Sequence, residues 1–201
     1  MDTNKLKQIG ANKMNIHLDD FDYPASENAA KTQIKGTLPT YHNASAILDE
    51  RAPQGRSIDF GAGLGIGASE IGYETFEPYA KKWAPDFNKA KDVPSNTYSR
   101  VTSLNVLNVV KRSDRDDIVR DIGRVLKAGG QAIITTRGSD VMKAAGRNGP
   151  EPMSKVTSRN TYQKGFKVAE LLDYLKTTLG NGFTVERLDL GPAGAVITKG
   201  K

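Results

Sequence analysis

The sequence predicts a single α/β domain with a Rossmann-like, mostly parallel sheet, helices on both faces, and an antiparallel hairpin at its C-terminal edge. Three observations predict it. Short apolar runs alternate with amphipathic helical patterns, which is typical of parallel sheets covered on both faces. One such run opens directly into a glycine-rich turn. The 201 residues suffice for one sizeable core but are short for two full domains. We expect a polar N-terminal arm over residues 1–35 and the domain over residues 36–201.

The first half of the domain is predicted to contain one helix and three strands. Ala44, Ile47 and Leu48 recur at helical spacing and predict a helix over residues 40–50, which the sequence Ala52-Pro53-Gln54-Gly55 ends. Short apolar runs between glycine, proline or charged residues predict buried strands. These strands are expected at residues 57–60, 73–76 and 98–104.

The second half continues the same alternation. Ile118, Ile122 and Val125 share one face of a predicted helix over residues 114–126, and the glycines at 129 and 130 end it. The glycines and prolines of residues 137–167 predict a loop. The remaining elements are a strand at 131–136, a helix at 168–179, and paired strands at 183–188 and 195–198.

Composition excludes several kinds of site. The chain has no cysteine, which rules out disulfides, thiolate metal sites and cysteine nucleophiles. His17 and His42 lack metal-ligand spacing, so no metal site is predicted. No window approaches the ~18 apolar residues of a membrane span, and the first eight residues lack the apolar core of a secretory signal. We therefore expect a cytoplasmic protein that does not associate with membranes.

The glycine run Asp59-Phe60-Gly61-Ala62-Gly63-Leu64-Gly65 follows the first predicted strand. Glycines allow a tight turn and let a ligand approach the backbone, and ligands of open α/β sheets bind at the carboxyl ends of the strands. Residues 63–68 also fit the dinucleotide pattern G-x-G-x-x-A. However, Asp59 would repel a pyrophosphate and attract an ammonium. Glu77 also comes sooner than the ribose-binding acid expected ~20 residues after dinucleotide glycines.

The pattern Asp59-x-Gly61-x-Gly63-x-Gly65 resembles the first motif of class I S-adenosylmethionine-dependent methyltransferases. Glu77 stands where that family places the acid that binds the ribose hydroxyls. Residues 102–110 resemble the family's fourth strand with its following turn, and residues 115–136 resemble its helix, Leu-Lys-x-Gly-Gly turn and fifth strand. The resemblance covers about residues 55–136 and implies S-adenosylmethionine as cofactor and methyl transfer as the reaction.

The resemblance also implies a set of cofactor-binding residues. From their positions alone, Thr37 and Tyr41, before and in the first predicted helix, are candidates to close over the methionine moiety, with a structural cap as the alternative. Asn105, at the end of the fourth strand, is a candidate to contact cofactor or acceptor, with a turn residue as the alternative. The family's adenine-binding acid aligns with Lys89, so either Asp92 takes this role or backbone groups and packing hold the adenine. The family's third strand is not recognisable between residues 84 and 92. The full set is Asp59, Gly61, Gly63, Gly65, Glu77, Asp92, Asn105, Thr37 and Tyr41.

A closer resemblance links the chain to short methyltransferase-like domains of phages or mobile elements. Residues 35–41 and 158–166 carry it.

Positive charge is concentrated in residues 137–167. Seven basic residues and two acids give this segment +5 of the chain's formal +6. Such a concentration favours an anionic partner, for example a nucleic acid, although a solvated basic loop is the alternative. Arg137, Arg159, Tyr162 and Lys164 could hold an anionic acceptor, and Tyr162 could stack on a base. Arg137 and Tyr162 are the candidate catalytic residues.

The acceptor and the oligomeric state are left open by the sequence. No Asp/Asn-Pro-Pro-Tyr/Phe sequence follows the fourth strand, which argues against amino methylation of DNA bases. The lack of cysteine excludes cytosine C5 methylation through a thiol adduct. RNA, a protein side chain or a small molecule remain as acceptors. Two other functions also remain: a non-catalytic adapter with this fold, favoured by Lys89 and Arg100 at positions where the family carries acids, and a NAD-dependent oxidoreductase.

Overall fold

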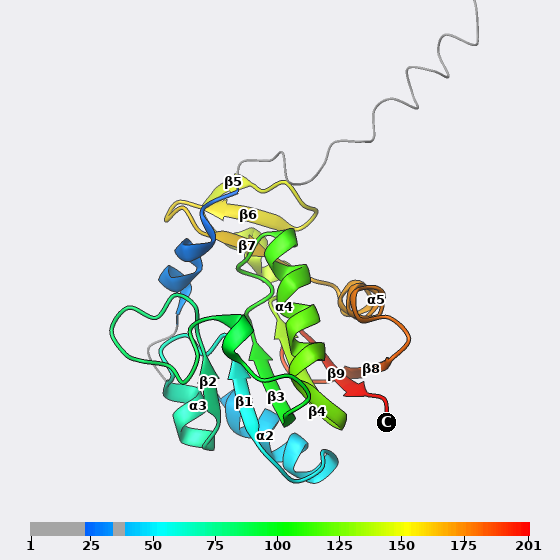
Figure 1. Cartoon of the computed structure of the whole chain (residues 1–201). Helices are drawn as coiled ribbons and strands as arrows, with labels where there is room; N and C mark the ends of the chain where they lie inside the picture. The colour runs from blue at the N-terminus through cyan, green and yellow to red at the C-terminus, as the bar shows by residue number, and fades with distance from the viewer. Residues whose placement is uncertain (1–22, 34–38) are drawn as a thin grey trace, which may run out of the picture.

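The computed structural model describes residues 23–33 and 39–201 (Figure 1). Its main sheet has six strands in the order β2-β1-β3-β4-β9-β8. The first four strands are parallel, whereas β9 is antiparallel to both of its neighbours. The predicted fold class, including the C-terminal hairpin, is therefore confirmed. The strands are β1 (Ser57–Phe60), β2 (Glu74–Phe76), β3 (Tyr98–Leu104), β4 (Leu126–Thr136), β8 (Phe183–Leu188) and β9 (Ala193–Lys199).

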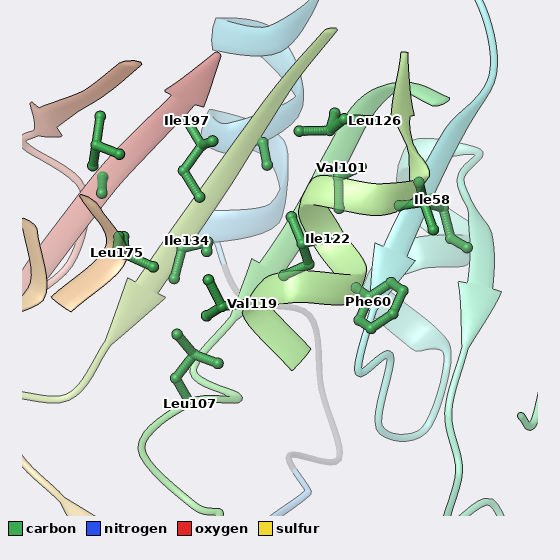
Figure 2. Close-up of a cluster of buried hydrophobic side chains, with 14 of the residues drawn as sticks. Ile58, Phe60, Val101, Leu107, Val119, Ile122, Leu126, Ile134, Leu175 and Ile197 are labelled. Atoms are coloured by element: carbon green, nitrogen blue, oxygen red, sulfur yellow. The ribbon is translucent and has the colours of Figure 1, made fainter. Parts of the chain in front are cut away.

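Helices cover both faces of this sheet. Successive residues of β4 point to opposite faces, so Ile134 joins one apolar cluster and Ile133 the other. The cluster around Ile134 is covered by α4 (Arg112–Val125) and α5 (Val168–Leu179), and Figure 2 shows Val119, Ile122 and Leu175 surrounding it. On the other face lie α2 (Pro39–Arg51) and the six-residue α3 (Ile66–Ile71).

Residues 137–167 form a folded subdomain, so the predicted loop is wrong. After the 3-10 helix η4 (Ser139–Lys143), three antiparallel strands form a second sheet in the order β5-β6-β7, above the carboxyl ends of β1 and β3 in Figure 1. The glycines and prolines that indicated a loop lie largely at turns; Gly149 donates its N–H to Ser154 across the β5–β6 turn. The strands are β5 (Gly146–Asn148), β6 (Ser154–Thr157) and β7 (Tyr162–Lys164).

At the β2 edge of the main sheet, the chain between residues 84 and 92 is irregular, which explains why no strand was recognised there from the sequence. Within residues 23–33 and 39–201, the pairing beside β2 is limited to one parallel bridge between Phe76 and Phe87. Asp86 holds this stretch in place by accepting hydrogen bonds from the N–H and hydroxyl of Thr75, both 2.8 Å long. The chain then forms the short 3-10 helix η3 (Ala90–Asp92) and returns to β3.

The described part of the predicted N-terminal arm contains the 3-10 helix η2 (Ser26–Thr32). Two side chains tie this segment to the domain. The hydroxyl of Ser26 hydrogen bonds to Asp114 at the start of α4, and the ring of Tyr23 lies edge-on against Tyr162 of β7, 5.0 Å between centroids. Across residues 23–33 and 39–201, none of the helices has the length and apolar character needed to span a bilayer.

Candidate functional site

A cavity of about 300 Å³ lies at the carboxyl ends of β1, β2 and β3. The loop after β1 forms one side, the start of α4 forms another, and η2 covers it from the N-terminal segment. Five of the predicted cofactor-binding residues are in its wall. They are Tyr41, Gly61, Gly63, Glu77 and Asn105.

The glycine loop turns sharply because three of its residues adopt left-handed backbone angles. Gly61, Gly63 and Gly65 have φ values of +94°, +62° and +75°. A Cβ on Gly61 would lie 2.6 Å from the Val106 side chain, and one on Gly65 would lie 2.9 Å from the Trp83 ring. At these two positions, neighbouring side chains occupy the space that the missing Cβ leaves.

Gly63 differs from its two neighbours. Among the described residues, the atoms nearest to a Cβ on Gly63 would be those of Gln33, at an ordinary contact distance of 3.5 Å, and Gly63 faces the cavity. Gly63 is therefore the position at which the missing side chain leaves room for a ligand close to the backbone.

Trp83 supports this loop and was not singled out from the sequence. Its ring covers Gly65, and its indole N–H donates to the carbonyl of Gly63 over 3.1 Å. Trp83 lies in the irregular segment after β2, where no motif marks it. Its only sequence signal is that it is the sole tryptophan of the chain.

Glu77 connects the end of β2 to the glycine loop. Its Oε2 accepts the N–H of Gly63 at 2.8 Å, and its Oε1 accepts the N–H of Tyr79 at 3.0 Å. Burial raises the pKa of this carboxyl group, against the effect of the two backbone hydrogen bonds. Each oxygen has a further lone pair, so the carboxylate can also accept hydrogen bonds from a ligand in the cavity.

Asp59 lies beneath the cavity and does not line it. The side chain is fully buried; Oδ1 accepts the Thr102 hydroxyl at 2.8 Å and Oδ2 accepts the Tyr41 hydroxyl at 3.0 Å. Burial raises the pKa of Asp59 to about 6, even though both hydrogen bonds favour the carboxylate. The structure therefore shows Asp59 positioning Tyr41, which itself lies in the cavity wall.

Replacing Asp59 with asparagine is expected to stabilise the ligand-free protein at pH 7. The folded-state pKa of about 6 exceeds the ordinary value of 3.8, so the folded protein binds this proton more tightly and loses stability as the pH rises between these values. Asp59→Asn should therefore raise the free energy of unfolding at pH 7 by roughly 1–3 kcal/mol. Urea unfolding at pH 7 and pH 3.5 checks this, because the gain should vanish at the lower pH. A variant equally stable or less stable at pH 7 would contradict it.

The remaining predicted cofactor-binding residues have different places. Gly65 lies outside the cavity wall, against Trp83. Asp92 is exposed and also lies outside the wall, so the structure does not support it as the adenine-binding acid, and nearby Ala90 lines the cavity instead. Thr37 lies outside the described residues. Asn105 has a φ of +59° and donates its N–H to Thr135, which fixes the turn at the end of β3.

The described wall of the cavity carries carboxyl groups and no basic side chain, although Lys111, Arg120 and Arg124, which lie outside the wall, pair with three of these carboxylates. Its ionisable carboxyl groups are those of Glu77, Asp114, Asp117 and Asp121, and no lysine or arginine is among the described lining residues. The rest of the wall is largely apolar, with Phe60, Phe76, Val106 and Ile118 among its side chains. Such a cavity favours an uncharged or cationic ligand over an anionic one.

The two candidate catalytic residues lie outside this cavity. Arg137 follows β4 and pairs with Asp140. Tyr162 is buried, and its hydroxyl donates to Glu151 at 2.5 Å, so its ring offers no open face for a base. Lys164 is also buried, and its ammonium pairs with Glu170 at 2.6 Å. The sequence predicts an exposed basic segment here because it does not reveal the acidic partners of these side chains.

Comparison with known proteins finds similarity in structure only. No protein-family model and no curated protein sequence matches the chain. A sugar N-methyltransferase from Streptoalloteichus sp. has a similar structure with a TM-score of 0.61 and 13% identity, over 90% of this chain and 95% of that one. The CcbJ methyltransferase from Streptomyces caelestis has a TM-score of 0.55 and 15% identity, over 90% of this chain and all of that one.

A third similar structure contains a bound ligand. It is 1,6-didemethyltoxoflavin N1-methyltransferase from Burkholderia thailandensis, with bound 1,6-didemethyltoxoflavin and S-adenosylhomocysteine. Its TM-score is 0.51 and its identity 17%, over 81% of this chain and 79% of that one. Together, these comparisons show that the chain has the fold of S-adenosylmethionine-dependent methyltransferases.

Proposed function

We propose that the protein binds S-adenosylmethionine in the cavity beside the glycine loop and transfers its methyl group to an acceptor. The observation that carries this proposal is the charge of the described wall, which contains four carboxyl groups and no cation. S-adenosylmethionine carries a sulfonium and an ammonium, both of which acidic walls attract. The shared fold supports the same cofactor.

The lining residues fit the parts of this cofactor. Glu77 would accept hydrogen bonds from the ribose hydroxyls, since Gly63 and Tyr79 occupy only part of its acceptor capacity. Phe76, Val106 and Ile118 would pack against the adenine, which agrees with holding the base by packing. Gly63 would allow the cofactor close to the loop, and Tyr41, held by Asp59, would close the opposite end.

Methyl transfer requires little from the protein beyond holding the acceptor in the correct position. The cofactor supplies an activated methyl group: its carbon–sulfur bond breaks as the acceptor's bond to that carbon forms, and sulfur keeps the electron pair as a neutral thioether. The acceptor's proton passes to water. Holding an acceptor in line can supply about 7–11 kcal/mol of the barrier. We therefore assign no general base to this chain.

A nicotinamide dinucleotide suits this cavity poorly. Its pyrophosphate is anionic, and the described wall offers carboxylates without a lysine or arginine to offset them. The helix after the glycine loop, α3, has only six residues. No observation favours a NAD-dependent oxidoreductase over the proposed function.

Titration calorimetry with S-adenosylmethionine, S-adenosylhomocysteine and NAD tests the proposal. We expect the first two to bind and NAD not to bind. Failure of the first two to bind would overturn it. Transfer of a radiolabelled methyl group to fractions of a lysate then tests catalysis. Tight cofactor binding with no transfer to any fraction would favour a binding or adapter protein instead.

Glu77→Ala is expected to weaken S-adenosylmethionine binding about 10- to 100-fold. Hydrogen bonds to a charged group are worth about 1.5–3 kcal/mol, and the variant also frees the Gly63 N–H. Glu74→Ala is the matched control, because Glu74 begins β2, the strand that ends just before Glu77, pairs with Arg56 and lines no part of the cavity. Calorimetry of both variants checks the prediction. Wild-type affinity in Glu77→Ala would show that this carboxylate does not hold the cofactor.

A further inference from the structure

A second cavity, of about 580 Å³, lies between η2, η4 and the β6–β7 turn. Its volume falls within the roughly 300–1,000 Å³ typical of small-molecule sites. The two cavities share Thr32, which lines both of them. Figure 1 shows η2 between the small sheet and the carboxyl edge of the main sheet. A molecule in the second cavity would therefore lie beside the first.

The charge of the second cavity is opposite to that of the first. Among its described lining residues, four carry basic side chains and one, Asp140, carries an acid that offsets them. Asp140 accepts hydrogen bonds from Arg137 and from the N–H of Gly138. Within the described part of the chain, the other three cations form no ion pair. The four basic residues are Lys31, Arg137, Lys143 and Arg159.

The cavity walls are held by contacts that do not involve the charged groups of these side chains. The β6–β7 turn, which carries Arg159, is closed by a 2.7 Å hydrogen bond between the hydroxyls of Thr157 and Thr161. Ser158 in this turn donates its N–H to Ala145 after η4. The carbonyl of Arg137 accepts the N–H of Phe166 at 2.9 Å. The backbone that presents the charges is therefore fixed by hydrogen bonds from three segments.

We propose that this second cavity binds a small, multiply charged anion, a phosphate ester or a polycarboxylate, and that this anion is part of the methyl acceptor. Only the role of the anion as methyl acceptor depends on the proposed function. The anion site itself is inferred from the shape and charge of the second cavity. Three net positive charges suit a group with two or more negative charges. The concave shape and the buried Tyr162, which leaves no stacking surface, favour a small molecule over a nucleic acid.

The test measures binding of pyrophosphate and citrate by calorimetry at low ionic strength. The variant Lys143→Gln/Arg159→Gln should bind both anions at least about 10-fold more weakly than the wild type. The matched control is Lys176→Gln/Arg187→Gln, which removes the same charges from exposed positions outside both cavities and should bind them like the wild type. Equal losses in the two double variants, or no binding of either anion, would overturn the anion site.

Two further measurements separate this inference from the proposed function. S-adenosylmethionine should bind Lys143→Gln/Arg159→Gln with wild-type affinity, because neither residue lines the first cavity. If the wild type binds the anions but not S-adenosylmethionine, the proposed function fails and the anion site alone stands. A single-stranded oligonucleotide is the third ligand. If it binds, loses affinity in this variant, and the small anions do not bind, a nucleic-acid site replaces the one proposed.

Discussion

Gly63→Val is expected to lower the affinity for S-adenosylmethionine at least about a hundredfold while the protein remains folded. The valine side chain would extend into the cavity at the point where the loop leaves most room for a ligand. The φ of +62° also disfavours any residue with a Cβ, at a cost of about 1–2 kcal/mol. Calorimetry measures the affinity, and circular dichroism with urea unfolding measures the fold and its stability.

The control variant Gly129→Val separates the effect of filling the cavity from the effect of backbone strain. Gly129 has a φ of +71°, a Cβ there would meet nothing within 4 Å, and the residue lies outside both cavities. The two variants should therefore lose similar stability, but only Gly63→Val should lose the cofactor. Normal binding by Gly63→Val, or equal losses of binding in both variants, would show that Gly63 does not border the cofactor.

Glu151→Ala is expected to destabilise the protein by about 3–5 kcal/mol, a large part of the total stability of a typical domain. Arg115 of α4 and Glu151 before β6 form a buried pair through two hydrogen bonds. Burial alone would raise the pKa of Glu151, but the hydrogen bonds and charge of Arg115 outweigh it and lower that pKa. Removing Glu151 leaves a buried guanidinium without its carboxylate and takes the acceptor from Tyr162.

The double variant Arg115→Met/Glu151→Met is the control for this prediction. It removes both charges and replaces them with apolar side chains, so it should be more stable than Glu151→Ala alone. Urea unfolding followed by tryptophan fluorescence and by circular dichroism measures the three proteins. If Glu151→Ala unfolds within about 1 kcal/mol of the wild type, the pair does not hold the small sheet to α4.

Much of the main sheet could be predicted because its strands and helices are indicated by residues that are close together in the sequence. The helix over residues 168–179 and the strand over 183–188 have the predicted bounds, since apolar spacing alone defines them. Gly61, Gly63, Glu77 and Asn105 lie around one cavity, because parallel strands bring their carboxyl ends together. Their contacts with a cofactor stay predictions.

The second sheet could not be predicted because the residues that stabilise it are far apart in the sequence. Its strands have three or four residues, too few for a clear alternation. Lys164 is buried only because Glu170 and two carbonyl oxygens surround its ammonium. Likewise, Arg115 stands in a run of charged residues, and nothing local indicates that Glu151 is its partner. The position of Asp59 beneath the loop, rather than facing a ligand, depends in the same way on Tyr41 and Thr102.

The acidic wall of the first cavity has a consequence for turnover. In the proposed reaction, a ligand in this cavity would lose the positive charge of its sulfonium, while the wall keeps its carboxyl groups. The attraction that draws the cofactor in therefore weakens once the methyl group has left. The charge of the wall would therefore favour exchange of spent for fresh cofactor.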